Sequence, residues 1–274
     1  MHVDYTGKTV FVAGGTTGIN FAIAQGFAKA GARIFVVSRK DDNVRGAVEK
    51  LRAIAPQADG TTADVRDLAA VEAAFAVCAE KFGEIDVLIS GAAGNFPIYA
   101  NALSSNGFKA VVDIDLVGTF HVMRAAFAHL KKPGAVAINI SAPQAVLAME
   151  AQIHVCAAKA GVDMVTRVLA LEWGGHGVRV LSVMPGPIEG TEGMKRLAPT
   201  PQLQQMAAET VPLKRMGTGA DIADACLALA SDYCRYISGA VIPVDGGWHL
   251  GGAAQAMAQA MTEARQRGSV KTGD

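Results

Sequence analysis

Lys159 and the residue four positions before it, Val155, carry the clearest chemical information in this chain of 274 residues. Residues four apart lie on one face of a helix, so both side chains of such a pair can act on the same reacting atoms. A lysine in these alanine-rich, apolar surroundings supplies a positive charge to a site. Val155 is a hydrocarbon and cannot donate a proton. The pair therefore predicts a reaction in which no side-chain acid acts from position 155.

Asp115 and Ser141 are the other polar side chains with a predicted catalytic role. Asp115 lies within the helical stretch 107–130, where a buried aspartate either holds a reactive water or bonds to neighbouring backbone. Ser141 directly follows the apolar run 135–140, at the edge where open α/β sheets bind ligands. We expect its hydroxyl to contact a ligand, and a serine in an ordinary strand-end turn is the alternative.

A glycine-containing turn joins the first apolar run, 9–13, to a helical pattern. Glycines at such a turn let the backbone approach a pyrophosphate, and the helix N-terminus offers free N–H groups. An ordinary tight turn is the alternative, but strand, turn and helix together favour a dinucleotide cofactor. The predicted cofactor contacts from this turn are Gly14, Thr16, Thr17, Gly18 and Ile19.

The second apolar run ends at Ser38, Arg39 and Lys40. An acidic residue here would accept a hydrogen bond from the ribose 2′-hydroxyl of NAD, whereas these three residues supply donors and positive charge that suit the 2′-phosphate of NADP. A solvated basic turn is the alternative. After the third run, Asp64 and Val65 are predicted beside the adenine, although Asp64 could equally well be a helix N-cap. The predicted cofactor is NADP(H).

These residues need a scaffold, and the sequence predicts one domain over 1–250. Short β-branched runs alternate with longer amphipathic stretches, which favours right-handed crossovers and a parallel sheet covered on both faces. We expect a single-domain α/β Rossmann fold with a doubly wound, seven-stranded parallel sheet. The predicted strands are 9–13, 33–38, 61–63, 85–90, 135–140, 178–183 and 240–244, and the predicted helices are 18–30, 42–54, 68–82, 107–130, 151–173 and 220–230.

Two segments stand outside this alternation. The stretch 185–213 is rich in Gly, Pro, Thr and Gln and is predicted to be a mobile lid. The stretch 251–274 begins alanine-rich and ends polar, and it is predicted to be a C-terminal tail, either an interface helix or a frayed end.

Composition excludes several classes of function. Lysine plus arginine equals aspartate plus glutamate at 25 each, without a basic stripe, so no nucleic-acid partner is expected. The histidines and the four cysteines show no metal-ligand spacing, so no metal site is predicted. Without a recognisable signal peptide, a membrane-spanning run or a peroxisomal ending, and with cysteines that read as reduced thiols, the expected location is cytoplasmic.

The chain resembles the short-chain dehydrogenase/reductase family over nearly its whole length. The features that carry the resemblance are the turn 14–18, Ser141, Lys159, the turn 184–187 and the closing Val-Asp-Gly-Gly at 244–247. The resemblance implies that Lys159 binds the nicotinamide ribose and that Thr191 bonds the nicotinamide amide. The further cofactor contacts that it implies are Ala92, Pro185, Gly186 and Ile188.

The chain departs from the family pattern at four places: Asn20 stands for a glycine, 90–94 for Asn-Asn-Ala-Gly, Asp115 for an asparagine and Val155 for the tyrosine. One branch departs in much the same way. The chain is similar to the NADPH-dependent 2,4-dienoyl-CoA reductases, especially the peroxisomal type, at 91–96, 152–154, 158–160, 172–174, 185–188 and 190–193.

Conjugate reduction makes the missing tyrosine intelligible. Hydride delivered to a distal carbon of a dienoyl thioester leaves a dienolate, whose proton finally goes to carbon rather than to oxygen. Donors at the enolate oxygen, each typically worth ~10²–10³ in rate, then matter more than an acid. The resemblance implies reduction of a 2,4-dienoyl-CoA to a 3-enoyl-CoA in the degradation of unsaturated fatty acids. The alternatives are another reductase of enoyl or 3-ketoacyl thioesters, and a non-catalytic NADP(H)-binding sensor or scaffold.

The acyl-CoA-type thioester is predicted to meet five residues. Asn95 and Phe96 are expected in the pocket wall, and Gln144 is expected to donate to the thioester oxygen. Lys195 and Arg196 are expected at the phosphates of coenzyme A, with exposed lid charges as the alternative. His154 is expected to be structural or exposed. The resemblance also implies a homotetramer, built through the long helices 107–130 and 151–173.

Overall fold

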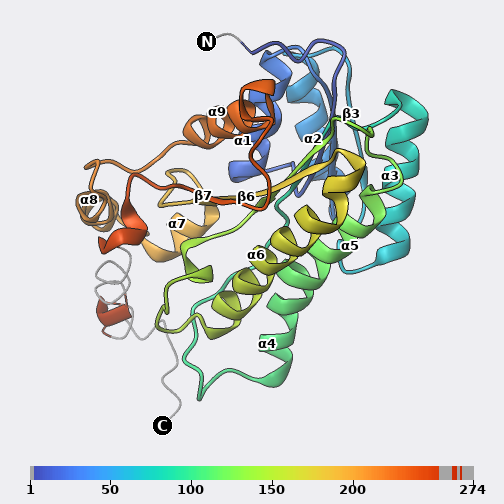
Figure 1. Ribbon diagram of the computed structural model, residues 1–274. Coiled ribbons are helices and arrows are strands. Elements are labelled where there is room, and N and C mark those ends of the chain that lie inside the picture. The colour runs from blue at the N-terminus through green and yellow to red at the C-terminus, as the bar shows by residue number, and fades with distance from the viewer. Residues whose placement is uncertain (1–2, 253–260, 264–265, 267–274) are drawn as a thin grey trace.

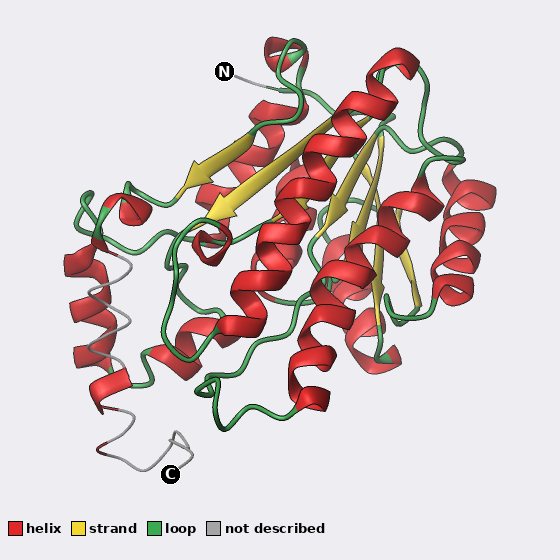
Figure 2. Cartoon of the chain, turned by 60° about the horizontal axis from the view of Figure 1, so that its bottom comes forward, coloured by secondary structure: helices red, strands yellow, loops and turns green. Residues whose placement is uncertain are grey.

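Seven parallel strands form one sheet in the computed structural model, which describes residues 3–252, 261–263 and 266. The strand order is β3-β2-β1-β4-β5-β6-β7, and helices cover both faces (Figures 1 and 2). The predicted doubly wound Rossmann fold is confirmed. The strands are β1 (Thr9–Ala13), β2 (Arg33–Ser38), β3 (Ala58–Thr62), β4 (Val87–Ser90), β5 (Val136–Ile140), β6 (Arg179–Pro185) and β7 (Val241–Val244).

Strand residues alternate between two apolar cores, one on each face of the sheet. In β1, Val10 and Val12 pack into the core beneath the first, second and ninth helices, and Phe11 packs into the opposite core. There the Phe11 ring stacks on Phe75 with centroids 4.0 Å apart. Because both faces are buried at the centre of the sheet, β1, β2 and β4 are mainly apolar rather than alternating with polar residues. The helices are α1 (Gly18–Lys29), α2 (Asp41–Arg52), α3 (Leu68–Phe82), α4 (Ser105–Val112), α5 (Gly118–Ala126), α6 (Ile153–Trp173), α7 (Glu192–Leu197), α8 (Pro201–Thr210) and α9 (Gly219–Ala230).

The third strand begins three residues earlier than the sequence indicates, at Ala58 rather than Thr61. Its first residues include Asp59 and Gly60, which favour turns, but pairing with β2 overrides that preference. Gly60 is also the residue that this pairing requires, because a Cβ there would lie 2.4 Å from the carbonyl oxygen of Val36.

The predicted helix 107–130 is broken into three pieces. A five-residue π-helix, Asp113–Val117, separates α4 from α5. Such segments are rare and occur frequently at functional sites. The sequence carries no proline or glycine pair that signals the change, so the prediction of one continuous helix was wrong. The π-helix contains Asp115.

The predicted lid, 185–213, contains two helices, α7 and α8, whose N-termini are capped by the side chains of Thr191 and Thr200. Two backbone hydrogen bonds join the start of the lid to the chain just after its end. The N–H of Gly217 donates to the carbonyl oxygen of Pro187, and the N–H of Glu189 donates to the carbonyl oxygen of Gly217. Most of the predicted tail, 251–274, lies outside the described residues. Among the described residues, no helix combines the length and apolarity that a membrane span needs.

Two helical glycines provide a test of how the helices pack. Helices α1 and α9 lie side by side (Figure 1), and a Cβ on Gly26 would lie 2.8 Å from the Cβ of Ala223. Gly46 on α2 has free space around it. We expect Gly26→Ala to lower the free energy of unfolding by about 1–3 kcal/mol through overpacking. Gly46→Ala, the matched control, should raise it by about 0.5–1 kcal/mol through helix propensity. Denaturant unfolding measures both, and equal effects of the two would contradict the close α1–α9 packing.

Candidate active site

Two adjoining cavities open at the carboxyl edge of the sheet, beside the point where the strand order reverses between β1 and β4. The first, the turn cavity, has a volume of ≈ 250 Å³. Eight predicted cofactor contacts line it together: Gly14, Thr16, Thr17, Ser38, Arg39, Asp64, Val65 and Ala92. Gly18 lines a neighbouring cavity with Thr16 and Thr17. Lys40 lines neither of these two cavities; its position is the N-cap of α2.

Close approach of two loops shapes the turn cavity. Gly14 has a φ of 75°, and a Cβ there would lie 2.9 Å from the Cα of Ala92. The amide of Asn20 donates to the carbonyl oxygen of Gly91 at 2.7 Å and lies 3.4 Å from that of Gly14. Asn20 thus ties the turn after β1 to the loop after β4, and it borders both cavities. A glycine in its place would leave the two loops untied.

The end of the turn cavity nearest β2 presents one positive group, Arg39, beside neutral hydrogen-bonding side chains. Ser38 and Arg39 border it, and so does Asn43, which the sequence reasoning missed. Asp64 is bound by the Arg66 guanidinium at 2.6 Å, and this bond lowers the pKa of the Asp64 carboxyl. Asp64 does not cap the following helix, because the N-cap of α3 is Asp67. The cradle of backbone and hydroxyl groups, with Arg39 at its end, fits a dinucleotide.

The second cavity, the lysine cavity, has a volume of ≈ 310 Å³ and brings the three predicted catalytic residues together. Lys159 and Val155 come from α6, Asp115 from the π-helix and Ser141 from the end of β5. Val155 lines the wall where an acid would stand, so this cavity receives only methyl groups from position 155. Other predicted residues on its wall are Ile19, Asn95, Gln144, Pro185, Gly186, Ile188 and Thr191.

The ammonium group of Lys159 is buried, with the residue 6% exposed. Its Nζ donates to the carbonyl oxygen of Ile140 at 3.0 Å and lies 3.4 Å from Oδ2 of Asp115. An ammonium group has three hydrogens, and these contacts engage two. One hydrogen therefore remains for a ligand in the cavity.

The Asp115 carboxyl is held by backbone as well as by charge. Its Oδ1 accepts the N–H of Gly94 at 2.7 Å. Burial raises the pKa of Asp115 above its ordinary value, and the opposing effects of Lys159 and the Gly94 N–H do not cancel it. Asp115 bonds to neighbouring backbone, as one reading expects, and it also lines the cavity; that it holds a reactive water stays a prediction.

Ser141 offers an uncommitted hydroxyl. The residue is 3% exposed, and its Oγ has no hydrogen-bond partner at standard distance among the described residues. A buried hydroxyl that borders a cavity is available to a ligand's oxygen or amide.

The predicted substrate contacts divide into two groups. Asn95 and Gln144 lie on the cavity wall, and both face the buried amide of Gln152, Gln144 at 2.8 Å. Phe96 is not on the wall; its ring packs 4.7 Å from the ring of His154. His154 is fully buried, and burial lowers its pKa, which fits the predicted structural role.

The lid charges lie apart from the lysine cavity. Lys195 borders the neighbouring cavity and pairs with Glu192 at 2.8 Å. The side chain of Arg196 lies outside the described part of the structure. Thr191 lies on the lysine cavity, where its Oγ1 also donates to the carbonyl oxygen of Ile188 and caps α7.

Apolar wall residues are what sequence reasoning missed. Ile140, Met194 and Trp248 line the lysine cavity, and the Trp248 indole N–H donates to Oγ1 of Thr210 at 2.9 Å. Trp248 follows the motif 244–247 by one position, but nothing local indicates that it reaches a site formed by the middle of the chain.

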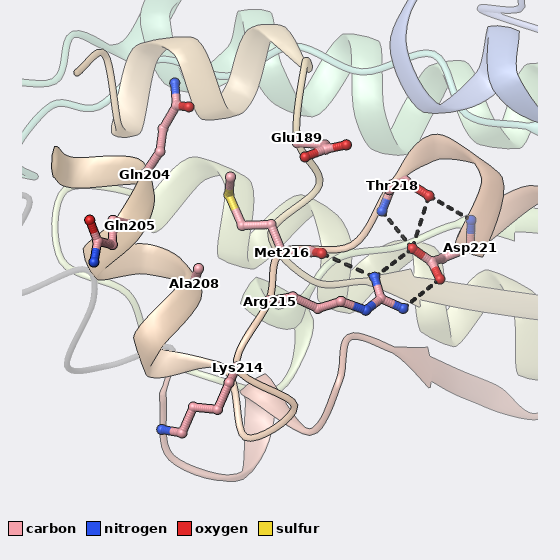
Figure 3. Close-up of a pocket in the computed structure, with 9 residues that line it drawn as sticks. All are labelled: Glu189, Gln204, Gln205, Ala208, Lys214, Arg215, Met216, Thr218 and Asp221. Carbon is pink, nitrogen blue, oxygen red and sulfur yellow. Dashed lines mark hydrogen bonds and ion pairs between the residues drawn. The ribbon is translucent and has the colours of Figure 1, made fainter. Parts of the chain in front are cut away.

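A third cavity, of ≈ 570 Å³, lies between the lid and α9 and contains none of the predicted residues (Figure 3). The guanidinium of Arg215 points at the carboxylate of Asp221, with nitrogen and oxygen 2.7 Å apart. Asp221 also bonds Thr218, and these bonds hold the pKa of its carboxyl well below the ordinary range. The charges here fasten the lid's C-terminal connection to α9.

Removal of the buried ammonium group tests the Lys159–Asp115 pair. We expect Lys159→Met to lower the free energy of unfolding by ~3–5 kcal/mol near neutral pH, because the Asp115 charge is left unpaired. The unfolded chains of both proteins titrate Asp115 alike, so the loss should grow as pH rises through the raised folded-state pKa of Asp115 and shrink below that pKa. Asp115→Asn in the same variant should restore part of the stability. Denaturant unfolding at several pH values measures this, and a pH-independent loss would contradict the pairing.

Comparison with known proteins agrees with this geometry. A family model described as Enoyl-(Acyl carrier protein) reductase matches residues 13–249. A peroxisomal 2,4-dienoyl-CoA reductase of Rattus norvegicus, of the (3E)-enoyl-CoA-producing type, is 43% identical over 242 residues, covering 88% of this chain and 83% of the relative. The Arabidopsis thaliana protein of the same description is 42% identical over 254 residues, covering 89% and 85%.

A solved structure extends the likeness to three dimensions. A short chain dehydrogenase from Bacillus anthracis superposes with a TM-score of 0.79 at 36% identity, covering 89% of this chain and 97% of that one. The sheet, the glycine turn and the matched residues 13–249 lead to one conclusion: this chain is an oxidoreductase that belongs to the short-chain dehydrogenase/reductase family.

Proposed function

We propose that this enzyme reduces a 2,4-dienoyl-CoA to a 3-enoyl-CoA with NADPH, a step in the degradation of unsaturated fatty acids. The observation that carries the proposal is the lysine cavity, where Lys159, Asp115 and Ser141 meet and Val155 stands in the place of an acid. The relatives described above are named for this reaction. A cavity with donors but no phenol suits a reaction whose proton ends on carbon.

The chemistry divides between cofactor and protein. NADPH, when bound, supplies the hydride. Addition of a hydride to C5 and of a proton to C2 converts the 2,4-diene into a 3-ene, and negative charge develops on the thioester oxygen in between. The Ser141 hydroxyl lies in the cavity wall and donates to that oxygen, whereas Lys159 contributes positive potential there and keeps its remaining hydrogen for the nicotinamide ribose. Donors of this kind are typically worth ~10²–10³ each in rate.

Asp115 is proposed to hold the water that protonates C2. Its carboxyl is fixed by the Gly94 N–H and by Lys159, which leaves little freedom for the group. Burial raises its pKa above that of an ordinary carboxyl group, so the ionised group is a stronger hydrogen-bond acceptor for the bound water. The aspartate therefore orients the water and balances the charge of Lys159.

NADP(H) rather than NAD(H) is the proposed cofactor. Ser38 and Arg39 border the turn cavity at the end of β2, where the 2′-phosphate would lie. The remaining predicted contacts, from Gly14 to Thr191, border the turn cavity, the lysine cavity or the cavity beside them, with the exception of Lys40.

The coenzyme A portion is proposed to leave the lysine cavity past Asn95 and Gln144, towards the lid. Lys195 and Arg196 on α7 are the proposed partners of its phosphates. Phe96 supports the wall from behind through His154 rather than contacting the substrate directly.

A homotetramer is the proposed assembly. Helix α6 lies alongside the continuous run of α4, the π-helix and α5 (Figures 1 and 2), and these helices expose large apolar side chains. The exposed residues are Phe108, Phe120, Met164, Val168 and Leu171, the last 84% exposed. A second copy of the chain would cover this face. The proposed location stays cytoplasmic, supported by four free cysteines, whereas the relatives are named peroxisomal.

The first test is turnover of a medium-chain 2,4-dienoyl-CoA with NADPH. We expect equal loss of the reduced nicotinamide and of the conjugated diene, because one hydride is consumed for each diene reduced. Spectrophotometry follows both signals. Reduction of a 3-ketoacyl-CoA or a simple enoyl thioester without dienoyl turnover would favour the family's other reductases. NADPH binding without any thioester turnover would indicate a sensor or scaffold.

The second test reverses the charge of Arg39 at the end of β2. We expect Arg39→Asp to lower kcat/KM for NADPH relative to NADH by roughly 10- to 100-fold, the value of a lost charged hydrogen bond. Lys40→Asp is the matched control, since it makes the same charge change one position away from the cavity wall. Steady-state kinetics with both cofactors decides the matter. Equal effects of the two substitutions would contradict a specific role for Arg39.

A further inference from the structure

Asp163 is a buried carboxyl group that the mechanism above leaves unused. It lies on α6 one turn after Lys159 and is 2% exposed. Neither of its oxygens has a hydrogen-bond partner at standard distance among the described residues. A carboxylate is almost never buried this deeply without a cation or several donors beside it. Its state and its purpose therefore need an explanation.

Two serine hydroxyls face Asp163 from the sheet. Ser141, after β5, and Ser182, on β6, both act on the carboxyl group through contacts that fall short of full hydrogen-bond geometry. The charged groups that face it are Lys159 and Arg167, both on its own helix. Burial raises the pKa of Asp163 and outweighs the opposing effects of Ser141, Lys159 and Arg167.

The hydrogens around Ser182 can be assigned. Thr166 has one hydroxyl hydrogen, which it donates to the carbonyl oxygen of Val162 at 3.1 Å. Its Oγ1 then accepts from the Asn139 amide and from the Ser182 hydroxyl, both at 2.8 Å. Ser182 therefore donates its hydroxyl hydrogen to Thr166, which leaves only an oxygen lone pair to face Asp163. That lone pair would repel an ionised Asp163, whereas a protonated Asp163 can donate a hydrogen bond to it.

We propose that Asp163 is a positioning residue, a neutral carboxylic acid that leaves the hydroxyl hydrogen of Ser141 free for the thioester oxygen. A neutral acid can donate to a serine oxygen while that serine donates elsewhere. An ionised Asp163 would instead take the Ser141 hydrogen in a charge-assisted bond, roughly twice as strong as a neutral one. Asp163 thus acts through Ser141, the only one of the two serines that borders the lysine cavity. This inference rests on the proposed function.

The kinetic test is the pH profile of kcat for the dienoyl thioester. The wild-type rate should fall as pH rises through the pKa of Asp163, because the ionised form withdraws the Ser141 hydrogen. Asp163→Asn, which keeps a donor but cannot ionise, should retain kcat within about 3-fold and lose this alkaline fall. Asp115 titrates in the same cavity, but it is unchanged in both proteins. An unchanged alkaline fall in Asp163→Asn would overturn the proposal.

A mutant cycle separates positioning from general damage. We expect Asp163→Ala to lower kcat roughly 10-fold, because Ser141 keeps its hydroxyl but loses its orientation. In a Ser141→Ala background the same change should have no further effect on kcat. In a Ser182→Ala background it should keep its full effect, since Ser182 does not border the cavity. If the double variant loses kcat by the product of the two single losses, Asp163→Ala and Ser141→Ala act independently, and the proposal is overturned.

Thermal unfolding against pH tests the neutral state of Asp163 without any substrate. A folded-state pKa above the unfolded value means that the wild type loses stability as pH rises, so the Tm of Asp163→Asn relative to wild type should increase with pH. If the Tm of Asp163→Asn relative to wild type falls as pH rises, Asp163 is a stabilised carboxylate. That result would overturn the inference about Asp163 and leave the proposed function standing. The expected Tm pattern without dienoyl turnover would instead overturn the proposed function, and the cycle would be repeated on whichever thioester is reduced. Failure to reduce any thioester would overturn both.

Discussion

Burial of the Lys159 ammonium group is the constraint on which the site depends. A buried cation must find partners, and it finds them in the carbonyl oxygen of Ile140 and the carboxylate of Asp115. The first requires that β5 end beside α6, and the second requires that the π-helix turn Asp115 inward. Two separate elements of the fold are therefore held at the same point by one charge, and the cavity forms between them.

The charge balance around Lys159 involves Asp163 as well as Asp115. Asp115 and Asp163 lie on either side of one lysine, and both are buried. Two full negative charges around one positive charge would leave an excess charge in a medium of low polarity, which is costly. The backbone N–H of Gly94 donates to Asp115, whereas Asp163 receives no full hydrogen bond from the two hydroxyl groups and the Arg167 charge that face it. The proton is therefore better placed on Asp163, and the charged pair remains where it faces the cavity.

Much of this arrangement could be predicted from the sequence, because it depends on local patterns. Strand, glycine turn and helix put Gly14 and Arg39 at one edge, and Ser141 lies there because parallel strands share their carboxyl ends; Lys159 reaches the same edge from α6. The residues that escaped prediction depend on distant packing. The π-helix at Asp113–Val117 has no local signal, and Trp248 reaches the cavity only because the last strand lies beside β6. Asn20 was noticed as a departure, but its bond to Gly91 needed the loops in three dimensions.

That bond has a consequence for how the chain can vary. A Cβ on Gly91 would lie 2.2 Å from Oδ1 of Asn20, so a side chain at position 91 would force the Asn20 amide out of its present bond to Gly91. A glycine at position 20 would open that space but break the tie between the loops. Positions 20 and 91 are therefore structurally coupled, and a substitution at either one should be accompanied by a compensating change at the other.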